Sequence, residues 1–214
     1  MSVVVAIKAN GKIYIGADSQ VTRGGTRTTL KNENNYKVWR VPNAPHCLMA
    51  QVGTLRDANV VRLMPNLVTE YNIYKEHICF DFVVKKVVPD IVEELTKYGF
   101  LKDGEKTDCL DSSFLFAYKD QLWSIGQDKS VIEVEDYVAI GSGSDQAIGS
   151  LLSTEGQDPK ERIVKAIKSS AACDIYVDYP IILTETETGE FEIITEKNEG
   201  KYIDEKKKKE NKTL

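Results

Sequence analysis

The chain opens with two apolar runs on either side of the dipeptide Asn10-Gly11. Residues 3–7 (VVVAI) and 13–17 (IYIGA) are apolar and rich in the β-branched residues that strands favour. Asn-Gly between two such runs is the strongest short signal for a β-hairpin. We therefore predict an opening hairpin whose first strand starts directly after Ser2.

Similar runs along the rest of the chain predict more strands, and four stretches have helical spacing. The strands are expected around 37–41, in HCLMAQVG (46–53), SSFLFAYKD, QLWSIG, SVIEVED and YVAIGSG, and in IYVDYPIIL and EFEIIT near the end. Helices are expected at 55–71, 80–98, 145–152 and 158–172, with Asp158 as N-cap of the last. The polar segment 19–36 is expected to be a loop.

The order of these elements predicts an α+β fold. Helices occur in pairs between groups of strands, which favours antiparallel sheets with helix layers outside them over alternating βαβ units. We expect one domain over residues 1–195. Residues 196–214, which include the run KKKK, are strongly charged and are expected to form a flexible tail.

Composition excludes several classes of protein. The chain has 214 residues and a net charge of -5, so its overall charge does not favour nucleic acid. It has no apolar run of membrane-spanning length and no secretory signal, so we expect a cytoplasmic protein without a membrane partner. The four cysteines are widely spaced, which predicts reduced, buried thiols rather than a zinc site.

Ser2 carries the first chemical hypothesis. Methionine aminopeptidases remove Met1 when a small residue follows, and Ser2 would then hold a hydroxyl and a free α-amine in one residue. An α-amine has a pKa of about 7.7–8.0, so it can accept a proton near neutral pH. A hydroxyl needs such a neighbouring base to become a useful nucleophile, and an N-terminal residue supplies both groups.

Asp18 and Lys37 are candidates to support that nucleophile. Asp18 follows the second strand of the hairpin, Lys37 begins the next predicted strand, and antiparallel neighbours could bring both to the N-terminus. A fixed cation would lower the pKa of the amine and the hydroxyl, and a carboxylate would hold that cation in place. Their spacing alone fits surface charges or turn residues better than a joint chemical role.

The stretch SVVVAIKANGKIYIGADSQVT resembles the start of proteasome β-type subunits and of the bacterial proteasome-like peptidase HslV. Four further segments match motifs of this family in the same order: YKVWRV, QVGTLRDA, AIGSGSDQAIGSLL and AACDIYVDYP. The resemblance covers residues 2–184. The chain departs from the family in three respects. It has serine in place of threonine at position 2, a longer segment between Gly24 and Lys37, and an extra strand and tail after Leu183.

The resemblance implies roles for individual residues. Ser2 would be the nucleophile, Lys37 the fixed cation, Asp18 its partner and Gly53 the oxyanion-binding residue. Ser142 and Asp174 would hydrogen-bond the amine and its water. Backbone carbonyls of Cys173, Tyr176 and Tyr179 would bind a structural Na⁺, K⁺ or Mg²⁺ ion, and the chemistry itself would need no cofactor.

The same resemblance implies the N-terminal nucleophile hydrolase fold, a four-layer αββα sandwich. It implies an endopeptidase of the threonine-peptidase type that assembles into homo-oligomeric rings, cuts unfolded proteins or peptides, and works with an AAA+ ATPase unfoldase. Two alternatives stay open at this point. One is a non-catalytic ring or scaffold subunit that retains Met1, and the other is a different N-terminal nucleophile amidase.

Overall fold

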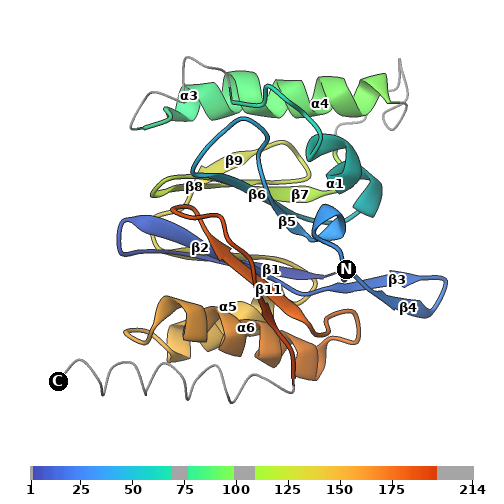
Figure 1. Ribbon diagram of the computed structural model, residues 1–214, viewed down its shortest axis with the longest axis vertical. Coiled ribbons are helices and arrows are strands. Elements are labelled where there is room, and N and C mark those ends of the chain that lie inside the picture. Colours follow the sequence, from blue (N-terminus) through green and yellow to red (C-terminus); the bar gives the residue numbers. More distant parts are fainter. Residues whose placement is uncertain (1, 69–76, 99–108, 197–214) are drawn as a thin grey trace.

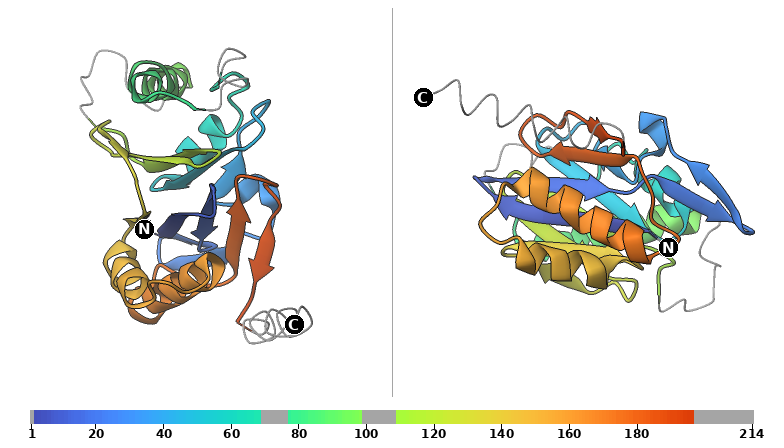
Figure 2. Two further views of the ribbon diagram at one scale, coloured as in Figure 1. Left: turned by 90° about the vertical axis from the view of Figure 1, so that its left-hand side faces the viewer. Right: turned by 90° about the horizontal axis from the view of Figure 1, so that it is seen from below.

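The computed structural model describes residues 2–68, 77–98 and 109–196, and these fold into four layers (Figure 1). Two five-stranded antiparallel sheets face each other in the middle, and helices cover the outer face of each sheet (Figure 2). Three apolar clusters fill the spaces between the layers. The expected α+β, αββα sandwich is confirmed.

The first sheet carries the N-terminus and has the strand order β10-β1-β2-β11-β12. Its strands are β1 (Val3–Ala9), β2 (Lys12–Ala17), β10 (Tyr137–Gly141), β11 (Ile181–Glu185) and β12 (Glu192–Ile194). Helices α5 (Ser144–Ser153) and α6 (Pro159–Cys173) cover its outer face. The Asn10-Gly11 turn has positive φ at both residues, as a tight hairpin turn requires, so the predicted hairpin is confirmed.

Strand β1 is buried on both faces, which explains its unbroken apolar sequence. Val3, Val5 and Ile7 contact the cluster beneath α5 and α6, whereas Val4 and Ala6 contact the cluster between the sheets. Side chains alternate between the two faces of a strand, so a strand with both faces covered needs apolar residues at every position. Ser2 is thereby held at the start of a strand that is covered on both faces.

The second sheet has the strand order β5-β6-β7-β8-β9. Its strands are β5 (Val38–Arg40), β6 (Cys47–Val52), β7 (Ser113–Tyr118), β8 (Gln121–Ile125) and β9 (Val131–Glu133). The outer layer holds α1 (Leu55–Val61) and a helical segment that runs through α3 (Phe80–Phe82), a π-helical turn (Val83–Val87) and α4 (Val88–Lys97). The π-helical turn ends two residues before Pro89, which has no N–H to donate and would cost an ordinary helix a hydrogen bond.

Several expected boundaries are wrong. Helix α1 ends at Val61 rather than continuing toward residue 71, because Pro65 disfavours helical conformation before it, and residues 69–71 lie outside the described residues. Strand β11 begins at Ile181, after Pro180, and not at Ile175. Within the expected loop 19–36, strands β3 (Gln20–Arg23) and β4 (Thr26–Thr29) form a hairpin, and a 3₁₀ helix spans Glu33–Asn35.

Two other expectations meet the structure only in part. Of the predicted tail, all but Glu196 lies outside the described residues. Cys47 is buried as expected, but Cys79, Cys109 and Cys173 are exposed, so the prediction of buried thiols is wrong for these three. Of the helices in the described ranges, none has the length and apolar character needed to cross a membrane.

Candidate active site

Ser2 lies at the start of β1 with only 4% of its surface exposed. Its Oγ accepts a hydrogen bond of 2.7 Å from Lys37 Nζ, although the two residues are 35 positions apart. Lys37 directly precedes β5 in the second sheet, so the contact joins the two sheets at one end of the sandwich. The structure therefore brings together the predicted nucleophile and the predicted cation.

Asp18 holds Lys37 in this position. Lys37 Nζ donates to both carboxylate oxygens of Asp18 at 2.8 Å and to the backbone carbonyl of Gln20 at 2.6 Å. The Asp18 carboxylate also accepts from the backbone N–H groups of Val3 and Gln20, each at 2.9 Å. Because Asp18 is fully buried, these three donors, which make four hydrogen bonds, supply the partners that a buried carboxylate needs.

The environment of Lys37 acts on its charge in two opposite directions. Burial lowers the pKa of the Lys37 ammonium, and the Asp18 carboxylate raises it. A carboxylate in contact with both the ammonium and the backbone of β1 keeps the positive charge pointed at Ser2 Oγ. That charge favours the ionised form of the hydroxyl, because opposite charges stabilise each other strongly where water is excluded.

Ser142 and Asp174 form a chain of hydrogen bonds to the backbone nitrogen of Ser2. Ser2 N donates to Ser142 Oγ at 3.1 Å, and Ser142 Oγ donates to Asp174 Oδ2 at 2.6 Å. Ser142 belongs to the turn between β10 and α5, and Asp174 is the C-cap of α6. In the full chain this nitrogen is the amide of the Met1–Ser2 bond, and removal of Met1 would make it an amine.

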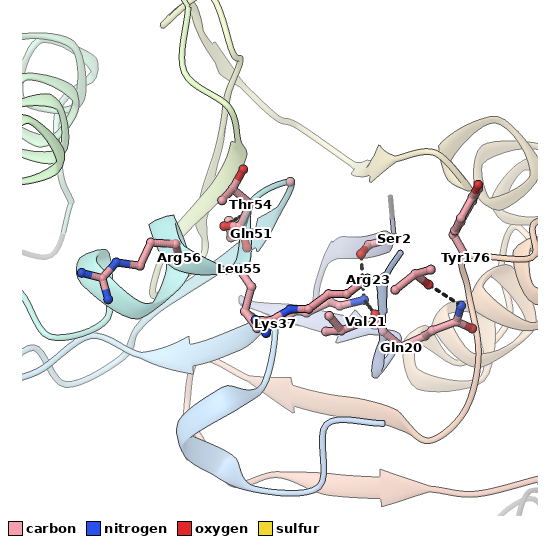
Figure 3. Close-up of a pocket in the computed structure, with 12 residues that line it drawn as sticks. Ser2, Gln20, Val21, Arg23, Lys37, Gln51, Thr54, Leu55, Arg56 and Tyr176 are labelled. Atoms are coloured by element: carbon pink, nitrogen blue, oxygen red, sulfur yellow. Dashed lines mark hydrogen bonds between the residues drawn. The ribbon is translucent and has the colours of Figure 1, made fainter. Parts of the chain in front are cut away.

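Gly53 lies in the turn between β6 and α1, with φ of +124°. A Cβ atom there would lie 2.4 Å from the carbonyl oxygen of Asp111, so no other residue fits without a shift of backbone. Gly53 and Ser2 both line a pocket of about 300 Å³, which also includes Tyr176 (Figure 3). Of the six predicted residues, three line this pocket and Ser142 contacts Ser2 directly. Asp18 and Asp174 are linked to Ser2 through Lys37 and Ser142.

The predicted cation ligands are less well defined. Cys173 ends α6, and Tyr176 and Tyr179 follow in the loop before β11, where Tyr176 N donates to Asp174 Oδ1. No cluster of three or more His, Cys, Asp or Glu side chains suited to a metal occurs among the described residues. Backbone carbonyls are the groups that the prediction names, and their binding of a cation stays a prediction.

Some residues of the site gave no signal in the sequence. The backbone carbonyl of Gln20 is a ligand of the Lys37 ammonium, and the Gln20 side chain donates to the carbonyl of Ile175 at 2.8 Å. A buried group beneath the Gly53 turn, consisting of Gln51, Asp57 and Ser112, also went unpredicted. Backbone carbonyls carry no sequence signal, and Ser112 stands in the unremarkable run LDSSF.

Comparison with known proteins agrees with this geometry. Residues 2–168 match the family model described as proteasome subunit. The ATP-dependent protease subunit HslV of Borreliella burgdorferi (strain ZS7) is 27% identical over 192 residues, which cover 86% of this chain and 95% of the relative.

Two solved structures share the fold. The BPH protein of Thiobacillus denitrificans superposes with a TM-score of 0.66 at 16% identity, covering 86% of this chain and 96% of the other, and it has also been solved in complex with epoxomicin. HslV from Trypanosoma brucei gives a TM-score of 0.61 at 18% identity, with coverage of 86% and 98%. The chain therefore belongs to the proteasome subunit family and is an HslV-like peptidase of the N-terminal nucleophile type.

Proposed function

We propose that the chain, once Met1 is removed, hydrolyses peptide bonds with Ser2 as its nucleophile. The contact between Lys37 Nζ and Ser2 Oγ carries this proposal, because a buried cation held by Asp18 has no need to face a serine hydroxyl for folding alone. Replacing a buried ion pair with apolar residues is often neutral or stabilising, so its presence at the N-terminus favours a chemical role.

In the first half of the reaction, Ser2 Oγ attacks the carbonyl carbon of the peptide bond. The hydroxyl proton passes to the α-amine of Ser2, which acts as general base directly or through one water. Ser142, itself hydrogen-bonded to Asp174, orients that amine. The Lys37 ammonium lowers the pKa of the hydroxyl and so makes the proton transfer easier.

The negative charge that develops on the carbonyl oxygen needs a donor in the pocket. The backbone N–H of Gly53 supplies it, in the turn that lines the pocket beside Ser2. The C–N bond then breaks, the leaving amine takes the proton from the α-amine, and an ester remains on Ser2 Oγ. In the second half, water attacks this ester, releases the acid and restores the hydroxyl.

The assembly is proposed from the relatives. Those named ATP-dependent protease subunit suggest that this chain is also a subunit of a homo-oligomeric ring in the cytoplasm, supplied with unfolded protein by an AAA+ ATPase unfoldase. Backbone carbonyls of Cys173, Tyr176 and Tyr179 would hold a Na⁺, K⁺ or Mg²⁺ ion that stiffens the loop beside Asp174. Mass photometry of the purified chain would test the ring, and thermal unfolding with and without added cations would test the ion site.

The decisive test compares Ser2→Ala with Ser2→Thr in the chain purified from a host that removes Met1. With a panel of fluorogenic peptides, Ser2→Ala should lose hydrolysis and Ser2→Thr should retain it, since threonine keeps the hydroxyl and the amine. Hydrolysis that survives in Ser2→Ala would contradict the proposal. A wild-type chain that retains Met1 and stays inactive would favour the scaffold subunit, and activity confined to small amides would favour another amidase.

A further inference from the structure

Four residues from two segments of the chain meet beneath the Gly53 turn. Gln51 is at the end of β6, Thr54 is in the turn itself, Asp57 is in the first helical turn of α1, and Ser112 directly precedes β7. The side chains of Gln51, Asp57 and Ser112 are nearly or fully buried. A buried polar cluster of this size is costly to assemble unless every donor and acceptor in it has a hydrogen-bond partner.

The hydroxyl of Ser112 is the centre of this group, and its hydrogen-bonding capacity is fully used. A hydroxyl has one hydrogen to donate and two lone pairs that accept. Ser112 Oγ donates to Asp57 Oδ2 at 2.6 Å and accepts from Gln51 Nε2 at 2.7 Å and from Thr54 N at 3.1 Å. The direction of each bond is therefore fixed, because Asp57 takes the only hydrogen.

The length of the bond between Ser112 and Asp57 fits an ionised carboxylate. Bonds from a hydroxyl to a charged oxygen are typically about 2.5–2.7 Å long. Because the carboxylate receives the hydroxyl hydrogen, both lone pairs of Ser112 are turned toward the N–H groups of Thr54 and Gln51. Gln51 Nε2 donates also to the carbonyl of Thr54 at 3.1 Å, so both polar groups of the Thr54 backbone are bound.

Gly53 rests directly against the same hydroxyl. A Cβ at Gly53 would lie 2.7 Å from Ser112 Oγ, which shows how closely the turn packs on this side chain. The N-cap residue of α1, Thr54, makes no capping bond with its own side chain, so the Ser112 contact takes over the task of fixing the start of the helix. The turn that carries the Gly53 N–H is thus set from below by Ser112.

We propose that Ser112, oriented by Asp57, is a positioning residue that holds the Gly53–Thr54 turn in the conformation that binds the reaction's oxyanion. This inference rests on the proposed function, since it gives Gly53 the role described there. Ser112 lies behind the turn and acts on the substrate only through Gly53. A displacement of about 1 Å in such a donor is sufficient to lower a rate by about a hundredfold.

The test uses the full chain with Met1 removed and three variants. Ser112→Ala removes the central hydroxyl, Ser112→Thr keeps it, and Thr186→Val is the matched control. Thr186 is as buried as Ser112, and its Oγ1 also accepts from a backbone N–H, that of Ile13 at 3.1 Å, and donates to the carbonyl of Lys119 at 2.5 Å. It supports the start of β2 and lines no part of the pocket beside Ser2.

We expect Ser112→Ala to lower kcat for a fluorogenic peptide by about ten- to a hundredfold with KM nearly unchanged, because the oxyanion forms only after the substrate is bound. Ser112→Thr should recover most of kcat, and Thr186→Val should keep it. The double variant Asp57→Ala/Ser112→Ala should be no slower than Ser112→Ala, because both residues act through one bond. An unchanged kcat in Ser112→Ala, or an equal loss in Thr186→Val, would overturn the inference.

A second measurement does not depend on hydrolysis. Hydrogen exchange of a peptide that covers residues 51–57 should be faster in Ser112→Ala than in wild type and unchanged in Thr186→Val. Unchanged exchange there would show that Ser112 does not hold the turn. Ser2→Ala, run in parallel, separates the two proposals, since hydrolysis that persists in it contradicts the function of Ser2 and leaves the exchange result on Ser112 standing.

Discussion

Lys37 Nζ lies 2.7 Å from Ser2 Oγ and 2.8 Å from both carboxylate oxygens of Asp18. The ammonium is thus the link between the first residue after Met1 and a carboxylate at the end of β2. Two of its acceptor residues, Ser2 and Asp18, flank strands of the sheet that carries the N-terminus, and the third, Gln20, begins β3. Lys37 itself directly precedes β5 of the other five-stranded sheet. The active-site geometry therefore depends on correct stacking of the two sheets.

Lys37→Met should remove activity and also destabilise the fold. Asp18 would stay fully buried without its cation, and breaking a buried pair on one side costs about 3–5 kcal/mol. Urea denaturation would measure the loss. The double variant Asp18→Asn/Lys37→Met should regain much of the stability and none of the activity, because both charges are then gone. If Lys37→Met is as stable as wild type, Asp18 does not depend on Lys37 as its buried counter-charge.

Gly53→Ala should lower kcat by about a hundredfold, the loss typical of one missing oxyanion donor. The added Cβ would collide with the carbonyl oxygen of Asp111, so the turn would have to move. Gly156→Ala is the matched control, since Gly156 also has positive φ, of +81°, but open space around its Cβ position, in the turn between α5 and α6. Equal effects of the two substitutions on kcat would show that strain alone explains the loss.

Ser142→Ala should slow hydrolysis by about ten- to a hundredfold, because the Ser2 amine loses the oxygen that orients it as a general base. Ser144→Ala, two residues along the same segment, should have little effect. The comparison uses initial rates on one peptide at saturating concentration. Ser142→Ala with a wild-type rate would show that the amine needs no orientation from this side.

Asp57→Asn should change how stability depends on pH. Burial raises the pKa of the Asp57 carboxyl above its ordinary value of 3.8, the bond from Ser112 opposes this, and Asp111 adds to it. Since the folded state holds the proton more tightly than the unfolded state, ionisation costs stability as pH rises through this window. Asparagine does not titrate, so the unfolding free energy of the variant should rise relative to that of wild type as pH increases from 3.8 toward neutrality.

Urea denaturation at several pH values in that range measures this difference. If the difference in unfolding free energy between wild type and Asp57→Asn is the same at every pH, burial does not shift the pKa of the Asp57 carboxyl. If wild type instead becomes more stable relative to Asp57→Asn as pH rises, the hydrogen-bond partners of Asp57 lower its pKa by more than burial raises it. Either result would remove the electrostatic argument for Asp57 while leaving the geometry of Ser112 to be tested by exchange.

The sequence predicted those features that depend on local chemistry. The Asn10-Gly11 dipeptide predicted the opening hairpin, and the position of Ser2 directly before the first strand made it a candidate nucleophile. Asp18 and Lys37 gained a joint role only through the family resemblance, because their convergence requires two sheets to stack. The same limit explains why Ser112 went unseen, since its partners Gln51 and Asp57 are 61 and 55 residues away.

The errors in element boundaries also have local physical causes. Apolar spacing continues beyond Val61, so periodicity alone extended α1 past its end, although Pro65 argued against this. The hairpin of β3 and β4 consists mainly of polar and exposed residues, and strand prediction relies on alternating apolar ones. Such a hairpin, whose second strand is exposed throughout, gives no hydrophobic pattern to detect.

The most direct test of the central claim is mass spectrometry of the N-terminal peptide after the purified chain has reacted with epoxomicin, the compound bound in the solved relative from Thiobacillus denitrificans. The proposed mechanism predicts a peptide that begins with Ser2 and carries one inhibitor molecule on that residue, in step with the loss of hydrolysis. A peptide that still begins with Met1 in an active chain, or an inhibitor attached elsewhere while hydrolysis is lost, would contradict it.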